Sequence, residues 1–172
     1  MKKLSILSIL IFSLLASCSH NKQLKSYPYW WNLSVENEIS SYGSGIYSDE
    51  KTAKFTAQNS AYQQFSGQIG NHLNKYVAEN CIASGDEVIQ KELDKIFTHF
   101  ISYFKNIEKP EISIGESESV IIKINKKQNI KYFVRLYIDE KYVHTKFVEF
   151  LDTSDLYMNP KLREVLKECF EE

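Results

Sequence analysis

The sequence has no long hydrophobic run and no block of basic residues. Its most apolar stretch, Leu4 to Leu15, has twelve residues, whereas a helix needs about 20 to cross the hydrocarbon core of a bilayer. A membrane-spanning helix is therefore not predicted. Lysine and arginine together number 21, against 22 acidic residues. Proteins that bind nucleic acid carry basic patches that neutralise phosphates, so nucleic acid is not an expected partner.

The sequence also lacks the motifs of common catalytic and metal sites. It contains no G-x-S-x-G, H-E-x-x-H or phosphate-binding-loop pattern. None of its histidines has a second histidine or a cysteine at metal-ligand spacing. These histidines are His20, His72, His99 and His144. We therefore expect no metal site and no non-covalent cofactor. Internal repeats and low-complexity segments are absent too, which favours a single domain.

The N-terminal residues instead indicate export. Lys2, Lys3 and the apolar stretch precede Leu15-Ala16-Ser17-Cys18, which resembles the lipobox of bacterial lipoproteins. The resemblance implies cleavage before Cys18, with a diacylglycerol thioether and an N-acyl chain such as palmitate on that residue. It predicts a signal peptide over residues 1–17, a lipidated cysteine and tether over 18–27, and one domain over 28–172. The alternative is an ordinary secretory signal with an incidental cysteine.

Removal of the first 17 residues leaves 155, a single-domain length. The polar residues Ser19 to Tyr27 reach at most about 30 Å when extended, so the domain would act close to its membrane.

Export permits a disulfide between Cys81 and Cys169. The sequence favours the other alternative, a buried thiol at Cys169 and a free one at Cys81, because their spacing does not show that they approach each other.

The first elements after the tether are a predicted strand and a long helix. The strand, Glu38 to Tyr47, contains Gly43 and Gly45, which favour a bulge or the close approach of another backbone. The helix is capped at residue 48 or 49 and extends to about Val77. Small and large apolar residues recur every fourth position on one face, and its three alanines allow close packing. This face comprises Ala53, Ala57, Ala61, Phe65, Ile69 and Leu73.

The rest of the chain predicts further helices and an antiparallel sheet. The next elements are a helix from Asp86 to Lys105, β segments at 112–114 and 120–124, a polar turn at 125–129 and a central strand at 130–138. The pattern after Asp139 favours a helix, with a strand over Tyr142 to Leu151 as the alternative. Pro160 begins a short last helix. The predicted fold class is α+β: an antiparallel sheet of three or four strands packed against two long helices, with a short C-terminal helix.

Several of these segments together resemble the lipoprotein-20 family of bacterial outer-membrane lipoproteins, which is similar in pattern to the N-terminal domain of the flagellar assembly protein T. The matching segments are the lipobox, Pro28-x-Trp30, SYGSGIY, Ala53-x3-Ala57-x3-Ala61 and YFVRLYIDEKYVHTKFVEFL. The chain departs from the family in having Tyr62 and Phe65 where a leucine is usual, and in the added helix at Pro160. The resemblance implies an outer-membrane lipoprotein that faces the periplasm or the surface and has no established catalytic residues. Ser19 after the lipidated cysteine agrees with outer-membrane sorting.

These observations predict a non-enzymatic, membrane-anchored domain that binds a protein partner in the cell envelope. An association with flagellar or outer-membrane assembly follows from the resemblance alone. The aromatic residues are the candidate partner contacts, although each could instead belong to the core or to a lid over it. They are Tyr29, Trp30, Trp31, Tyr42 and Tyr47. Two alternatives remain: an envelope hydrolase that uses Glu116 and Glu118 as an acid pair, and a carrier of a small apolar ligand in a cavity under the long helices. The oligomeric state is left open.

Overall fold

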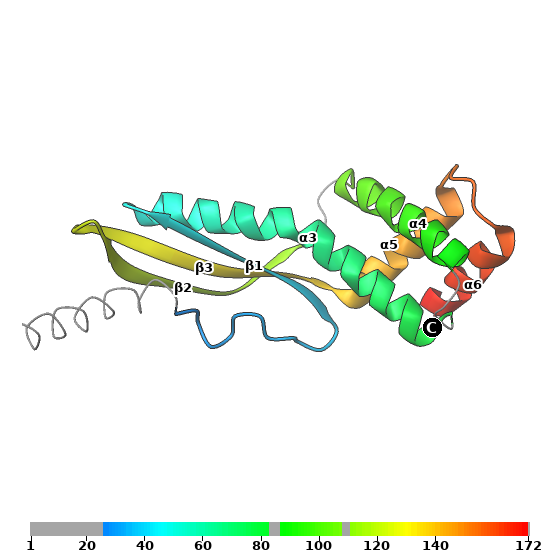
Figure 1. Cartoon of the computed structure of the whole chain (residues 1–172), viewed down its shortest axis with the longest axis horizontal. Coiled ribbons are helices and arrows are strands. Elements are labelled where there is room, and N and C mark those ends of the chain that lie inside the picture. Colours follow the sequence, from blue (N-terminus) through cyan, green and yellow to red (C-terminus); the bar gives the residue numbers. More distant parts are fainter. Residues whose placement is uncertain (1–25, 83–86, 108–110, 172) are drawn as a thin grey trace, which may run out of the picture.

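The computed structural model describes residues 26–82, 87–107 and 111–171, and it confirms the α+β class. A three-stranded antiparallel sheet has the order β1-β3-β2, and α3 runs along it toward a second, helical end of an elongated molecule (Figure 1). The elements are β1 (Glu38–Tyr47), α3 (Glu50–Asn80), α4 (Glu87–Lys105), β2 (Ser113–Ile124), β3 (Lys127–Asp139), α5 (Glu140–Thr153) and α6 (Pro160–Glu171).

Strand β3 lies at the centre of the sheet, as its long apolar pattern predicts. It is joined to β2 by a two-residue turn in which Asn125 and Lys126 have φ of 50° and 64°. Positive φ at both residues matches the twist of a tight hairpin. The strand therefore begins at Lys127, inside the segment predicted as a five-residue turn. The two predicted β segments before the turn form one strand, β2, which has an irregular register between Ile114 and Ser117.

Helix α3 packs on one face of the sheet through small residues on both sides. Gly43 and Gly45 of β1 face Ala53, Ala57 and Ala61 of the helix. A Cβ on Gly43 would lie 2.5 Å from the Ala61 nitrogen and nearer still to the Ala57 carbonyl oxygen. The sequence predicted either a bulge or a close backbone approach at these glycines. At Gly43 the structure shows the close approach.

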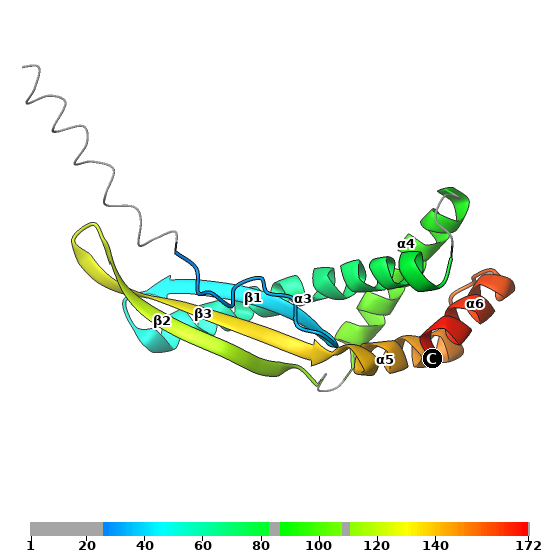
Figure 2. The same ribbon diagram turned by 90° about the horizontal axis from the view of Figure 1, so that it is seen from below.

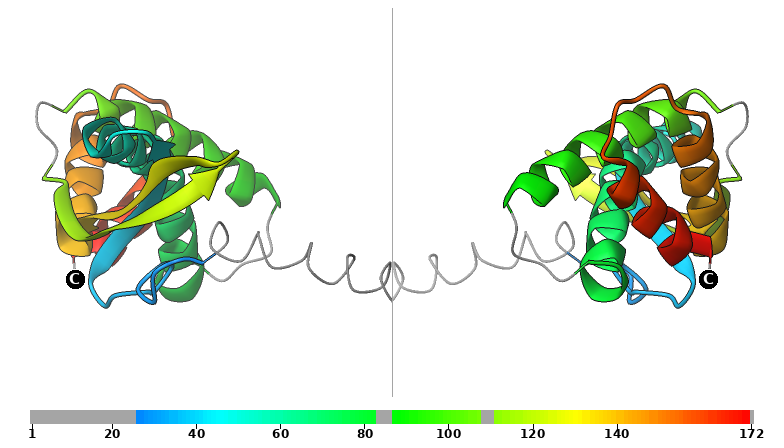
Figure 3. Two further views of the ribbon diagram at one scale, coloured as in Figure 1. Left: turned by 90° about the vertical axis from the view of Figure 1, so that its left-hand side faces the viewer. Right: turned by 90° about the vertical axis from the view of Figure 1, so that its right-hand side faces the viewer.

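The helical end is built from aromatic packing. Phe100 of α4 contacts Phe147 and Phe150 of α5 with ring centroids 5.1 and 5.6 Å apart, and Phe147 contacts Phe170 of α6 at 4.8 Å. The end views in Figure 3 show α4, α5 and α6 gathered beside α3. Edge-to-face and tilted pairs of this kind add to the free energy of apolar burial, so this end forms the aromatic part of one continuous hydrophobic core.

Most predicted helix boundaries are close to the observed ones. Asp49 caps α3 by accepting a hydrogen bond from the Thr52 nitrogen at 2.8 Å, and the helix ends at Asn80, one turn after the predicted end. Asp139 caps α5 in the same way, so the strand alternative over Tyr142 to Leu151 is wrong. Asp86, where the second helix is predicted to begin, lies outside the described residues.

The segment before β1 covers the opposite face of the sheet. Figure 2 shows it, in dark blue, running along the strands on the side away from α3. Tyr27 and Trp31 pack on Phe133 of β3, with centroids 5.8 and 5.5 Å apart. Both faces of β3 are therefore buried, which explains its run of six consecutive buried residues from Lys131 to Leu136.

Candidate functional site

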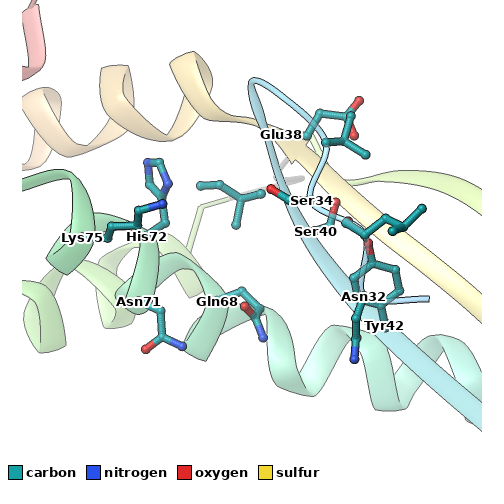
Figure 4. Close-up of a pocket in the computed structure, with 12 residues that line it drawn as sticks. Asn32, Ser34, Glu38, Ser40, Tyr42, Gln68, Asn71, His72 and Lys75 are labelled. Atoms are coloured by element: carbon teal, nitrogen blue, oxygen red, sulfur yellow. Dashed lines mark hydrogen bonds between the residues drawn. The ribbon is translucent and has the colours of Figure 1, made fainter. Parts of the chain in front are cut away.

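A groove lies between α3, the edge strand β1 and the segment that precedes it (Figure 4). Its volume is about 520 Å³. Amide, hydroxyl and aliphatic side chains line most of the groove. Besides Tyr42, its ionisable residues are Glu38 on β1 and His72 and Lys75 on α3. Its other lining residues are Asn32, Leu33, Ser34, Val35, Ile39, Ser40, Tyr42, Gln68 and Asn71.

His72, at the α3 side of the groove, belongs to a cluster with two residues of α5. Its Nε2 lies 2.9 Å from Nε2 of His144. Oε1 of Glu140 lies 3.7 Å from Nε2 of His72 and 3.8 Å from Nε2 of His144. Glu140 and His144 are four residues apart in α5 and therefore project from the same side of that helix. The cluster thus joins the C-terminal half of α3 to the first turns of α5.

The cluster is mostly shielded from solvent. The exposed fractions of the side chains are 19% for His72, 12% for His144 and 30% for Glu140. The ring of His144 is also packed against Tyr76 and Phe170, with centroids 4.4 and 4.8 Å away. These contacts fix the orientation of the imidazoles.

The surroundings favour the neutral form of both imidazoles. Burial, followed by the proximity of His72, lowers the pKa of His144 from 6.5 to about 4. Burial also lowers the pKa of His72, although the Glu140 carboxylate acts in the opposite direction. Two neutral rings at this distance form an N–H···N hydrogen bond in which one ring donates. Neutral imidazole is also the form that ligates metal ions.

Sequence reasoning missed this pair because His72 and His144 are 72 residues apart. The expectation that every histidine stands alone is wrong for these two. The only local signal was the spacing of Glu140 and His144. They lie four residues apart on a predicted helix, which places two possible metal ligands on one side of that helix. His99 is exposed on α4, and His20 lies outside the described residues.

The five aromatic residues predicted to contact a partner do not form one surface. Trp30 is 6% exposed, whereas Tyr29 is 87% exposed. Trp30 stacks on Tyr42 and Trp31 packs against it at a tilt, on the face of the sheet opposite α3, as a lid would. Tyr42 and Tyr47 are five positions apart in β1, and side chains alternate between the faces of a strand. Tyr47 therefore projects toward the other face.

Glu116, one member of the proposed acid pair, is bound to Arg135. The guanidinium of Arg135 bridges the carboxylates of Glu38 and Glu116 on the outer face of the sheet. This hydrogen bond lowers the pKa of Glu116, whereas a general acid needs a raised carboxyl pKa. Glu118 is exposed on the edge strand β2. This arrangement does not favour the hydrolase alternative.

Cys81 and Cys169 form a disulfide with a Cα–Cα distance of 5.6 Å. This outcome corrects the expectation of unpaired thiols. Tyr76 of α3 packs on Phe170 with centroids 4.7 Å apart and donates a hydrogen bond to the Cys169 carbonyl at 3.3 Å. That packing brings the C-terminal end of α3 to α6, which spacing along the chain could not indicate. Cys18 lies outside the described residues.

The carrier alternative requires an apolar cavity between the long helices. A hollow of about 380 Å³ lies between α3 and the end of α4. Its lining includes the apolar residues Phe65, Ile69, Phe104 and Ile112, together with Tyr62 and polar groups. The hollow is at the surface, since Tyr62 is exposed.

Comparisons with protein-family models, curated proteins and solved structures find no match to this chain. Within residues 26–82, 87–107 and 111–171, no helix combines the length and the apolar character needed to cross a bilayer.

Proposed function

We propose that this chain is a lipid-anchored lipoprotein of the bacterial outer membrane whose domain binds a protein partner in the cell envelope and catalyses no reaction. The observation that carries the proposal is Leu15-Ala16-Ser17-Cys18, placed directly after a short basic and apolar leader. A lipidated Cys18 carries two or three acyl chains, and more than one chain is needed for stable anchoring. The resemblance to the lipoprotein-20 family supports the outer-membrane location.

The short tether supports a role close to the membrane. Tyr27 is packed on Phe133, so the free tether ends where the folded domain begins. Residues between Cys18 and Tyr27 span at most about 30 Å when extended. The domain is thereby confined to partners in or near the membrane that carries its lipid.

The groove beside β1 supports a polypeptide as the ligand. Its amide and hydroxyl groups, such as Gln68 and Asn71, can hydrogen-bond with a peptide backbone, and the exposed Leu33 and Val35 offer apolar contacts. β1 is an edge strand, and extended peptides bind beside such strands. We therefore place the partner, an extended segment of an envelope protein, in this groove.

Metabolic labelling with palmitate tests the anchor. The wild-type chain should incorporate the label and fractionate with membranes, whereas Cys18→Ser should do neither. The matched control is the double substitution Cys81→Ser and Cys169→Ser, which removes the other two cysteines and should still be labelled. Label in the Cys18→Ser chain at the wild-type level would refute lipidation at this residue.

Site-specific photo-crosslinking in intact cells tests the groove. A photoreactive residue at Gln68 or Asn71 should yield the same cross-linked envelope protein, identified by mass spectrometry. The control position is Thr98, which is exposed on α4 and should not yield that product. If the product forms equally well from Thr98, or from neither groove position, the groove is not the partner surface.

A further inference from the structure

We propose that His72, Glu140 and His144 form a three-ligand site for a divalent transition metal ion, with Zn²⁺ as the ion that fits the donor set best. The site goes beyond the proposed function and does not depend on it, because its residues belong to the folded domain and not to the anchor. Two observations carry it: the convergence of the donor atoms and the way the fold holds them.

The three donor atoms already lie near the spacing that a metal requires. One ligand atom from each residue can be chosen so that all three lie within 4.8 Å of one another. Zinc binds imidazole nitrogen and carboxylate oxygen at about 2.0–2.2 Å, so tetrahedral ligands stand about 3.3 Å apart. The observed separations are 2.9 Å between the two Nε2 atoms and 3.7 and 3.8 Å to the Glu140 oxygen. Each separation therefore lies within about half an ångström of that spacing, and a bound ion would replace the hydrogen bond between the two Nε2 atoms.

The backbone positions of the ligands are fixed by the core. Leu73, next to His72, and Val143, next to His144, are fully buried. Glu140 begins α5 directly after the Asp139 cap, and its own nitrogen donates to the Asn37 carbonyl at 3.0 Å. The ligands therefore come from two helices whose side chains meet, and sites on helices are held more precisely than sites on loops.

The donor set selects the class of ion. Two imidazole nitrogens and one carboxylate oxygen suit zinc and its neighbours in the transition series, whereas calcium and magnesium require oxygen ligands. Three protein ligands leave a fourth position for water or another donor. The groove reaches His72, and a second hollow of about 670 Å³ reaches Glu140 and His144. Ions and water therefore have access from both sides.

The charges nearby are compatible with a cation. Glu140 supplies one negative charge within the cluster, and Asp139 contributes a second close to His144. Lys75 lies on the same side of α3 as His72 and opposes a cation, but its side chain is largely exposed and interacts with Glu79 at 3.9 Å. The lysine can turn toward solvent, whereas the two acidic groups are held by the start of α5.

Metal titration of the full-length lipoprotein, purified in detergent without a histidine tag, tests the site. Calorimetry should detect one Zn²⁺ per chain, and Co²⁺ should give the visible absorption bands of a four-coordinate site. His72→Asn and Glu140→Gln should each weaken binding by at least about tenfold. The matched control is His99→Asn, since His99 is exposed on α4, away from these ligands, and it should bind like the wild type.

Folding of each variant is verified by near-UV circular dichroism, and Glu140→Gln keeps the test valid should His72→Asn fail to fold. The proposal is overturned if the wild-type chain does not bind Zn²⁺. It is equally overturned if folded Glu140→Gln and His72→Asn bind like the wild type, or if His99→Asn is weakened as much as they are. Loss of palmitate labelling alone would leave these outcomes unchanged, so the failure of the anchor and that of the metal site are distinguishable.

Discussion

Replacing Gly43 by alanine should separate the long helix from the sheet. The added Cβ would lie 2.5 Å from the backbone nitrogen of Ala61 and would overlap the carbonyl oxygen of Ala57. Both atoms belong to the backbone of α3, so no side chain can rotate away to make room. The strand and the helix must move apart instead.

The size of the effect follows from that movement. Real Cβ atoms essentially never approach another heavy atom within 3.0 Å, so Ala61 alone requires a shift of at least 3.0 − 2.5 = 0.5 Å. A gap of 0.5–1 Å removes a quarter to a half of the dispersion energy of each affected contact. Overpacking of this kind typically costs about 1–3 kcal/mol. We expect about 3 kcal/mol, the upper end, because the obstacle is backbone.

Urea unfolding followed by circular dichroism measures this loss. The urea midpoint of Gly43→Ala should fall, and in thermal unfolding its Tm should lie about 10 °C below that of the wild type for a domain of this size. Gly67→Ala is the matched control: Gly67 lies in α3 with nothing near its would-be Cβ, and alanine there should stabilise the helix by about 1 kcal/mol. A Gly43→Ala chain within about 1 kcal/mol of the wild type would refute the close approach of α3 to β1.

Three further predictions concern other parts of the domain. Reducing the Cys81–Cys169 disulfide should lower the free energy of unfolding by about 4 kcal/mol, because the bond joins residues 88 apart; an unchanged urea midpoint in reductant would contradict this. With a chelator present, the free energy of unfolding should fall as the pH is lowered from about 6.5 to about 4. Burial and the proximity of His72 lower the pKa of His144 from 6.5 to about 4 in the native state. In this pH range the unfolded chain therefore binds a proton that the native chain does not. The loss from His144 should be about 2 kcal/mol after allowance for solvent screening, and His144→Asn should remove this part while leaving the contribution of His72; equal pH dependence in both chains would contradict the assignment. Glu116→Gln should cost about 1 kcal/mol by weakening the hydrogen bond to a buried guanidinium, whereas the exposed Glu118→Gln should change stability by less than about 0.5 kcal/mol; equal losses in urea unfolding would argue against a structural role for the Glu116 ion pair.

The elements that could be predicted from the sequence are those with local causes. The strand Glu38 to Tyr47 is predicted with its observed bounds, and α3 is predicted from a four-residue apolar period and the cap at Asp49. Periodicity and capping act within a few residues, so they are readable without knowledge of the fold. The junction at Asp139, where β3 passes directly into α5, was predicted for the same reason.

The candidate site could not be predicted because its contacts are distant in sequence. His72 meets His144 only when α5 packs beside α3, and Cys81 meets Cys169 only through the packing of α6. The groove likewise depends on how the segment before β1 folds over the sheet. A sequence shows which residues carry useful chemistry, whereas the tertiary packing decides which of them meet.

The two ends of the molecule are held together by different kinds of interaction. At the sheet, α3 is fixed by close backbone contact with Gly43, and that contact contains no group that titrates or reacts near neutral pH. At the helical end, α3 is linked to α5 by the pair of His72 with His144 and to α6 by the disulfide of Cys81. Protonation, metal ions and reductants act on the second set alone. We therefore expect protonation and reductants to loosen the helical end and a bound metal ion to stabilise it, while the contact between α3 and the sheet at Gly43 stays intact.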